Sequence, residues 1–157
     1  MKEELFLFEK ELIFLNDKSR SSDMLFRKTG DMLEERGYVE KTFTEAVQAR
    51  EREYPTGLRT FPFSIAIPHA DSVHTKREAV VVVRPERPIR FREMATVDQY
   101  VDAELIFLLL LKKDNAHAEF LEVLLEMTQQ EEFMIGIMQA QDAKEAFGLL
   151  EKYFNAH

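Results

Sequence analysis

The sequence contains no cysteine among its 157 residues, so it has neither a disulfide framework nor a thiolate nucleophile. Glycine is scarce, with five residues, and none of them stands in the G-x-x-x-x-G-K pattern of a nucleotide-binding loop. Long apolar runs are also missing, because the longest, Leu105 to Leu111, is far too short to cross a bilayer. Group-transfer chemistry would therefore have to use His, Asp, Glu, Ser or Lys side chains, and ATP is not expected as a phosphoryl donor.

Basic residues are the minority charge, with 21 Lys and Arg against 29 Asp and Glu and a formal net charge of −8. This balance opposes nonspecific binding to nucleic acid or anionic lipid, and it favours encounter with a basic protein partner. The N-terminus, Met1-Lys2-Glu3-Glu4, lacks the form of a signal peptide. We therefore expect a cytoplasmic protein that binds no nucleic acid and does not insert into the membrane.

Hydrophobic periodicity predicts a single domain over residues 1–157 in which strands and helices alternate. The predicted strands cover 5–8, 12–15, 64–67, 79–84, 89–91 (an edge strand) and 104–112. The predicted helices cover 23–36, about 42–53, a segment after 115, 131–138 and 143–154. Ser21 or Ser22 is expected to cap the first helix and Gly37 to end it. The arrangement predicts an α/β fold with a mixed central sheet flanked by helices on both faces.

One segment, Ser64-Ile65-Ala66-Ile67-Pro68-His69-Ala70, delivers a histidine where proline prevents an apolar strand from continuing. The unperturbed pKa of histidine leaves a large neutral fraction near pH 7, and neutral imidazole can form covalent intermediates. His69 is therefore a candidate nucleophile. Upstream, Arg52-Glu53-Tyr54-Pro55-Thr56-Gly57-Leu58 places charge, a hydroxyl and a glycine turn before the histidine strand.

Together the two segments resemble the phosphorylation site of enzyme IIA (EIIA) of the sugar phosphotransferase system (PTS), in the fructose/mannitol superfamily. That family shows R-E, one to three residues, P-T-G/Y-L, a short spacer and then I-A-I/V-P-H. The strand at 79–85 and the segment Asn115-Ala116-His117-Ala118-Glu119 fall where the family has a core strand and its second histidine. The residues of both motif halves look most similar to those of the galactitol branch.

The resemblance implies a phosphotransferase component that works through a phosphohistidine. His69 would accept a phosphoryl group from the carrier protein HPr and pass it to a cysteine of an EIIB component, with no metal or cofactor. By the same resemblance His117 would assist and Arg52 would stabilise the phosphate. Thr56, the backbone near Gly57, and Glu53 complete the predicted binding residues.

Several alternatives stay open at this point. The partner that fixes the His69 tautomer is either a backbone carbonyl or His117. The chain could also be a regulatory EIIA-like module that binds proteins without sugar transport, or a hydrolase with His69 as general base. A metal site fits poorly, since there is no cysteine and no H-E-x-x-H. The sugar, the oligomeric state and the role of His74 are not predicted. The docking face is expected to include Leu58, Phe61, Phe63 and Ile67.

Overall fold

The computed structural model describes residues 5–112 and 114–157, with the backbone alone for 114–117. Its centre is a six-stranded sheet in the order β1-β4-β6-β3-β2, with β5 paired to β6 off this path. The strands are β1 (Phe8–Asp17), β2 (Gly57–Leu58), β3 (Ser64–Ala66), β4 (Ala79–Pro85), β5 (Ile89–Arg92) and β6 (Tyr100–Leu110). The sheet is mixed, because β1 with β4 and β3 with β6 are parallel and the other pairs are antiparallel.

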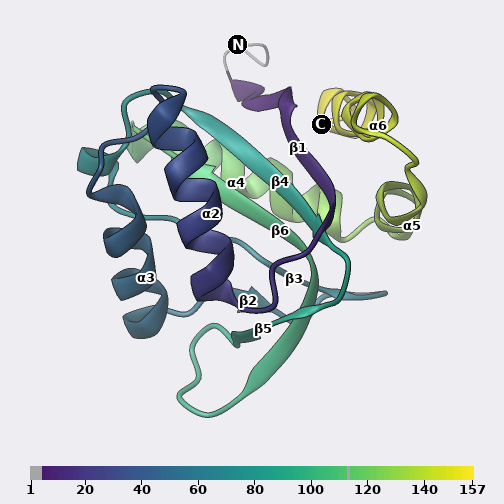
Figure 1. Ribbon diagram of the computed structural model, residues 1–157. Helices are drawn as coiled ribbons and strands as arrows, with labels where there is room; N and C mark the ends of the chain where they lie inside the picture. Colours follow the sequence, from purple (N-terminus) through teal and green to yellow (C-terminus); the bar gives the residue numbers. More distant parts are fainter. Residues whose placement is uncertain (1–4, 113) are drawn as a thin grey trace.

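Helices cover both faces of this sheet, which confirms the predicted fold class (Figure 1). One face carries α2 (Ser22–Glu35) and α3 (Phe43–Glu53). The other carries α4 (Asp114–Thr128), α5 (Glu131–Gln139) and α6 (Ala143–Asn155). Alternate residues of β4 enter the two cores, with Val80 and Val82 on the α6 side and Val81 and Val83 on the α2 side. The unbroken apolar runs of β4 and β6 reflect this burial on both faces.

The predicted ends of α2 and α3 are close to the observed ones. The Ser21 hydroxyl caps α2 by accepting a hydrogen bond from the Met24 N–H, and Gly37 follows the helix with φ +83°. Helix α3 starts after Thr42, whose hydroxyl contacts His74 Nδ1 at 2.8 Å instead of capping the helix. It ends at Glu53, two residues before Pro55, as the restriction on residues before proline predicts.

Two parts of the prediction were wrong in detail. Residues 5–8 and 12–15 do not form two strands, since β1 is one strand with an irregular register between Phe8 and Ile13. That irregularity places Phe8 and Ile13 in the same core, although their odd spacing would put them on opposite faces of a regular strand, while Leu12 enters the other core. Strand β2 and the short 3₁₀ helix Ser72–His74 were not predicted. Within the described residues, no helix has the length and apolar character needed to span a membrane.

Candidate functional site

His69 lies just beyond β3, and the central strand β6 holds its backbone. The carbonyl of Pro68 accepts a hydrogen bond of 2.9 Å from the Leu109 N–H, and His69 forms an isolated parallel bridge with Leu109. The side chain of His69 is half-buried between the fully packed Pro68 and Ala70. The segment predicted to end a strand therefore anchors the histidine to the central strand of the sheet.

A backbone carbonyl sets the tautomer of the His69 ring. Nδ1 lies 3.0 Å from the carbonyl oxygen of Ile67. A carbonyl oxygen can only accept a hydrogen bond, so Nδ1 carries the hydrogen and Nε2 carries the lone pair. Of the two partners left open by the sequence, the structure thus places the carbonyl at Nδ1. His117 belongs to the first turn of α4, and its side chain lies outside the described residues.

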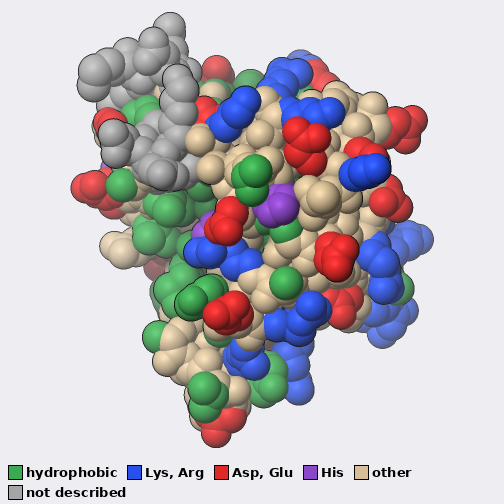
Figure 2. Space-filling model, turned by 90° about the vertical axis from the view of Figure 1, so that its left-hand side faces the viewer, with side chains coloured by type: hydrophobic (Ala, Val, Ile, Leu, Met, Phe, Trp, Pro, Cys, Tyr) green, Lys and Arg blue, Asp and Glu red, His purple; other side chains and the backbone are tan. Residues whose placement is uncertain are grey.

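A cavity of about 390 Å³ opens beside His69, and we call it the histidine cavity. It is lined by Arg50, Glu53, Tyr54, Pro55, Thr56, His69, Met94, Ala95 and Thr96. A second hollow shares Arg50 and His69 with this cavity and is also lined by Asp71 and Leu111. In the view from the α3 side, histidine side chains reach the surface among acidic and basic side chains (Figure 2).

Arg50 places its guanidinium group at the histidine cavity, which it lines. It pairs with Asp71 at 3.2 Å, and its guanidinium lies over the Tyr54 ring at 5.3 Å from the centroid. Its Nε is buried and has no hydrogen-bond acceptor among the described residues. A guanidinium with an unused, fixed donor next to an imidazole is a suitable group to receive a phosphate oxygen.

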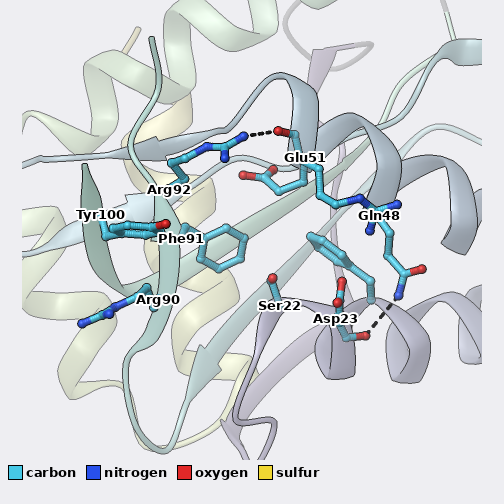
Figure 3. Close-up of a pocket in the computed structure, with 10 residues that line it drawn as sticks. Ser22, Asp23, Gln48, Glu51, Arg90, Phe91, Arg92 and Tyr100 are labelled. Atoms are coloured by element: carbon cyan, nitrogen blue, oxygen red, sulfur yellow. Dashed lines mark hydrogen bonds between the residues drawn. The ribbon is translucent and has the colours of Figure 1, made fainter. Parts of the chain in front are cut away.

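Arg52, the predicted phosphate ligand, lies elsewhere. It lines a cavity of about 180 Å³ that we call the arginine pocket (Figure 3). The arginine pocket consists of Ser22, Asp23, Phe26, Gln48, Glu51, Arg52, Arg90, Phe91, Arg92 and Tyr100. Residues two apart on a helix point about 200° apart, so Arg50 and Arg52 cannot face the same cavity. The motif spacer of one to three residues fits Arg50-Glu51 as well as Arg52-Glu53, and only the helix geometry separates them.

The other predicted binding residues differ in their placement. Glu53 is exposed and Thr56 is buried, and both residues line the histidine cavity. The N–H and hydroxyl of Thr56, however, already donate to Glu51, at 2.8 and 2.7 Å. Gly57 is buried where a Cβ would lie 2.7 Å from Val101 Cγ2 and 2.8 Å from the Arg92 carbonyl oxygen. Glycine at position 57 therefore permits close packing of β2 against its neighbours.

No role at the site was predicted for Glu51 from the sequence. Burial raises its pKa to about 7, against the opposing effects of the Thr56 hydrogen bonds and of the Arg92 and Arg50 charges. In a chain with 29 acidic residues, no local pattern distinguishes this glutamate from its exposed neighbours. The useful signal was the alternative motif register, in which Glu51 directly follows Arg50.

The apolar rim of the histidine cavity also differs from the prediction. Leu58 and Phe63 pack against the core on the α6 side, Ile67 is buried, and Phe61 is 72% exposed without lining the cavity. The apolar residues that do line the cavity are Tyr54, Pro55, Met94 and Ala95. In the described part of the chain, no group of three or more His, Cys, Asp or Glu residues is arranged to hold a metal ion.

Comparisons with known proteins agree on one family. Residues 6–153 match the family described as phosphoenolpyruvate-dependent sugar phosphotransferase system, EIIA 2. The chain is 32% identical over 109 residues to the galactitol-specific EIIA component of the PTS from Escherichia coli K12, covering 69% of this chain and 71% of that one.

Solved structures of similar fold extend the comparison. The complex of enzyme IIAMtl with phosphorylated enzyme IIBMtl from Escherichia coli matches with a TM-score of 0.73 and 25% identity, covering 93% of this chain and 99% of that one. The nitrogen regulatory protein IIA-Ntr from Neisseria meningitidis matches with a TM-score of 0.65 and 24% identity over 92% and 96% of the two chains, which shows the fold alone.

Proposed function

Since the chain belongs to the EIIA 2 family of the phosphoenolpyruvate-dependent sugar phosphotransferase system, we propose that it is a phosphocarrier whose phosphorylated residue is His69. The observation that carries the proposal is the contact between His69 Nδ1 and the Ile67 carbonyl. It leaves the lone pair on Nε2, in a ring that borders an open cavity together with a guanidinium group. Those are the features that a phosphoryl-accepting histidine needs.

In the proposed reaction, Nε2 of His69 attacks the phosphorus of a phosphohistidine on HPr. The new P–N bond forms as the bond to the donor imidazole breaks, and the electron pair stays with the donor ring. In the second half, a cysteine thiolate of EIIB attacks the same phosphorus, and the P–Nε2 electrons return to His69. Positioning and charge stabilisation supply the catalysis in such transfers, so no resident cofactor takes part in the proposed reaction.

Arg50 takes the role of phosphate ligand in this proposal. Its guanidinium borders the same cavity as His69, and its buried Nε has no acceptor among the described residues, so it could donate to a phosphoryl oxygen. The Asp71 carboxylate holds the guanidinium in place until the anion arrives. His117 remains the predicted assisting residue, and His117→Ala is expected to slow transfer without abolishing it.

The partners and the sugar follow from the relatives. The curated relative at 32% identity is named galactitol-specific, and the IIAMtl structure was solved with phosphorylated IIBMtl. We therefore extend to this chain an EIIB partner and galactitol as the sugar of the system. HPr as donor and a cytoplasmic location complete the proposal, as the family resemblance and the sequence imply. The regulatory alternative receives less support, because the match to IIA-Ntr is 24% identical.

Incubation with phosphoenolpyruvate, enzyme I and HPr tests the proposal directly. Intact mass measured under alkaline conditions, in which phosphohistidine survives, should show one added phosphoryl group on the wild-type chain. Peptide mapping should place it on His69, and galactitol EIIB should remove it. Labelling of another residue would overturn the site assignment. Absence of labelling would favour the regulatory module, and turnover of a phosphoester would favour a hydrolase.

A further inference from the structure

Glu51 holds a residue of the histidine cavity without lining that cavity itself. Its Oε1 accepts the Thr56 hydroxyl at 2.7 Å, and its Oε2 accepts the Thr56 N–H at 2.8 Å. Thr56 is 3% exposed and lines the histidine cavity, whereas Glu51 lines the arginine pocket. Any influence of Glu51 on that cavity through these bonds must therefore pass through Thr56.

The hydrogen bonds continue from Thr56 to the nucleophile. The Thr56 carbonyl accepts the Ile67 N–H at 3.2 Å, and the Ile67 carbonyl accepts the His69 Nδ1–H at 3.0 Å. A charge-assisted bond at one end of such a chain strengthens the bonds that follow it. The carboxylate of Glu51 is thus linked to the ring nitrogen that fixes the tautomer of His69.

We infer that Glu51 is a positioning residue for phosphoryl acceptance: it fixes Thr56 and thereby the Ile67 carbonyl that holds the His69 ring with its lone pair on Nε2. The inference rests on the proposed function of His69. Glu51 does not line the cavity in which the phosphoryl group would lie, so its hydrogen-bonded path to the ring runs through Thr56 and Ile67.

The surroundings of Glu51 make this role dependent on its ionisation. Arg92 on β5 and Arg50 on its own helix favour the carboxylate, while burial disfavours it and dominates. Asp23 from α2 and the side chains of Arg52 and Arg90 complete the charged lining of the pocket. Figure 3 shows Arg92 and Glu51 close together at one end of the pocket. The carboxylate offers two full acceptor oxygens to Thr56, whereas protonation weakens one of them as an acceptor and an amide puts a donor in its place.

The spectroscopic test compares Glu51→Gln with Glu45→Gln, a matched charge change at an exposed position of the same helix. Long-range ¹H–¹⁵N correlation spectra of the His69 ring report its tautomer. At pH 8, the wild-type and Glu45→Gln proteins should show the Nδ1–H tautomer almost alone. In Glu51→Gln the Nε2–H tautomer should become clearly populated. An unchanged tautomer in that variant would overturn the inference.

The kinetic test measures the rate of phosphoryl acceptance from phospho-HPr at pH 6 and pH 8. The ratio of the wild-type rate to the Glu51→Gln rate should be close to one at pH 6 and about tenfold at pH 8, because misplacement of a reacting group costs this much or more. A ratio that stays the same at both pH values would contradict the inference.

Thr56→Val completes the test, because it removes the hydroxyl and keeps the amide. Alone it should shift the tautomer in the same direction by a smaller amount, and it carries the test if Glu51→Gln does not fold. Combined with Glu51→Gln it should add little, since both changes act through one residue. If the effects of Thr56→Val and Glu51→Gln on the rate multiplied in the double variant, the proposed path through Thr56 would be wrong. If the wild-type chain accepts no phosphoryl group, the proposed function fails and the role of Glu51 in it fails too, while the tautomer still shows whether Glu51 holds the ring.

Discussion

Two cavities meet at the last turn of α3, and none of the described residues lines both of them. The histidine cavity takes Arg50 and Glu53 from this turn, and the arginine pocket takes Glu51 and Arg52. Alternate residues of R-E-R-E thus face alternate sites, as the helical angle of about 100° per residue requires. The comparison shows that a residue matched to a sequence motif can be assigned a role only when the orientation of its helix is known.

The two cavities also differ in what their charges are paired with. The arginine pocket holds three arginines but no histidine, and Arg90 stacks on Tyr100 and faces Asp102 at 3.9 Å. The histidine cavity holds one arginine, paired with Asp71, beside a ring of fixed tautomer. If His69 is the reactive residue, as proposed, the number of guanidinium groups is a poor guide to the reactive site and the neighbouring histidine is a better one.

The largest expected difference between the two cavities comes from removing the nucleophile. His69→Ala should abolish phosphoryl acceptance, because among the described residues that line the histidine cavity no other is a neutral nitrogen nucleophile. Gln48→Ala in the arginine pocket should leave acceptance within about twofold, since it is remote from the reacting atoms. Intact mass under alkaline conditions measures both. If His69→Ala still gained a full phosphoryl group, the histidine cavity would not be the reactive one of the two cavities.

Replacing each of the two arginines separately by glutamine tests which of them the helix orientation directs to the reacting group. Arg50→Gln should slow phosphoryl acceptance by about 10² through loss of a charge-assisted donor to the transferring group. Arg52→Gln should slow it by about twofold at most, through the lost surface charge. Single-turnover rates with phospho-HPr, and unfolding midpoints as a folding control, decide between them. If Arg52→Gln is the slower variant, the register with the shorter spacer is the functional one.

Sequence reasoning was most accurate where the pattern is strong and local. Helix α2, with its Ser21 cap and Gly37 end, follows from periodicity and capping chemistry alone. The buried strands β4 and β6 follow from apolar runs that only a doubly covered strand tolerates.

The errors arise where tertiary contacts decide. Strand β2 has two residues and exists because β3 pairs with it. The choice of Arg50 over Arg52 needs the orientation of α3 on the sheet, which no local pattern supplies. The role of Glu51 depends on burial by elements distant in sequence, among them β5.

The pH dependence of stability tests the boundary between the cavities. Burial raises the pKa of Glu51 from 4.5 to about 7, so the folded protein holds this proton more tightly than the unfolded chain. The resulting stabilisation is complete below about pH 4.5 and is lost as the pH rises through 7. The free energy of unfolding of the wild type, relative to Glu51→Gln, should thus fall by up to about 3 kcal/mol from pH 4.5 to pH 8. Urea unfolding of both proteins at the two pH values measures it, and parallel pH profiles would contradict it.

Gly57 offers the smallest predicted effect, and it concerns the strand between the two cavities. Gly57→Ala should destabilise the protein by about 1–3 kcal/mol, because its Cβ would meet Val101 and the Arg92 carbonyl. Gly148→Ala is the control, since nothing lies within 4 Å of a Cβ at that position on α6. It should stabilise the protein by up to about 1 kcal/mol. Urea unfolding at one pH separates the two, and equal midpoints would show that β2 adjusts at no cost.

The bridge between His69 and Leu109 has a consequence for how the protein opens. The Leu109 N–H bonds to the Pro68 carbonyl from within β6, the strand that pairs with β3, β4 and β5. Amides of such a strand exchange with solvent deuterium only on the slowest, near-global opening, so Leu109 should be among the last to exchange. The phosphoryl-carrying residue would then belong to the same cooperative unit as the core. Phosphorylation and dephosphorylation of His69 would then change the surface charge without local unfolding of the segment that holds the residue.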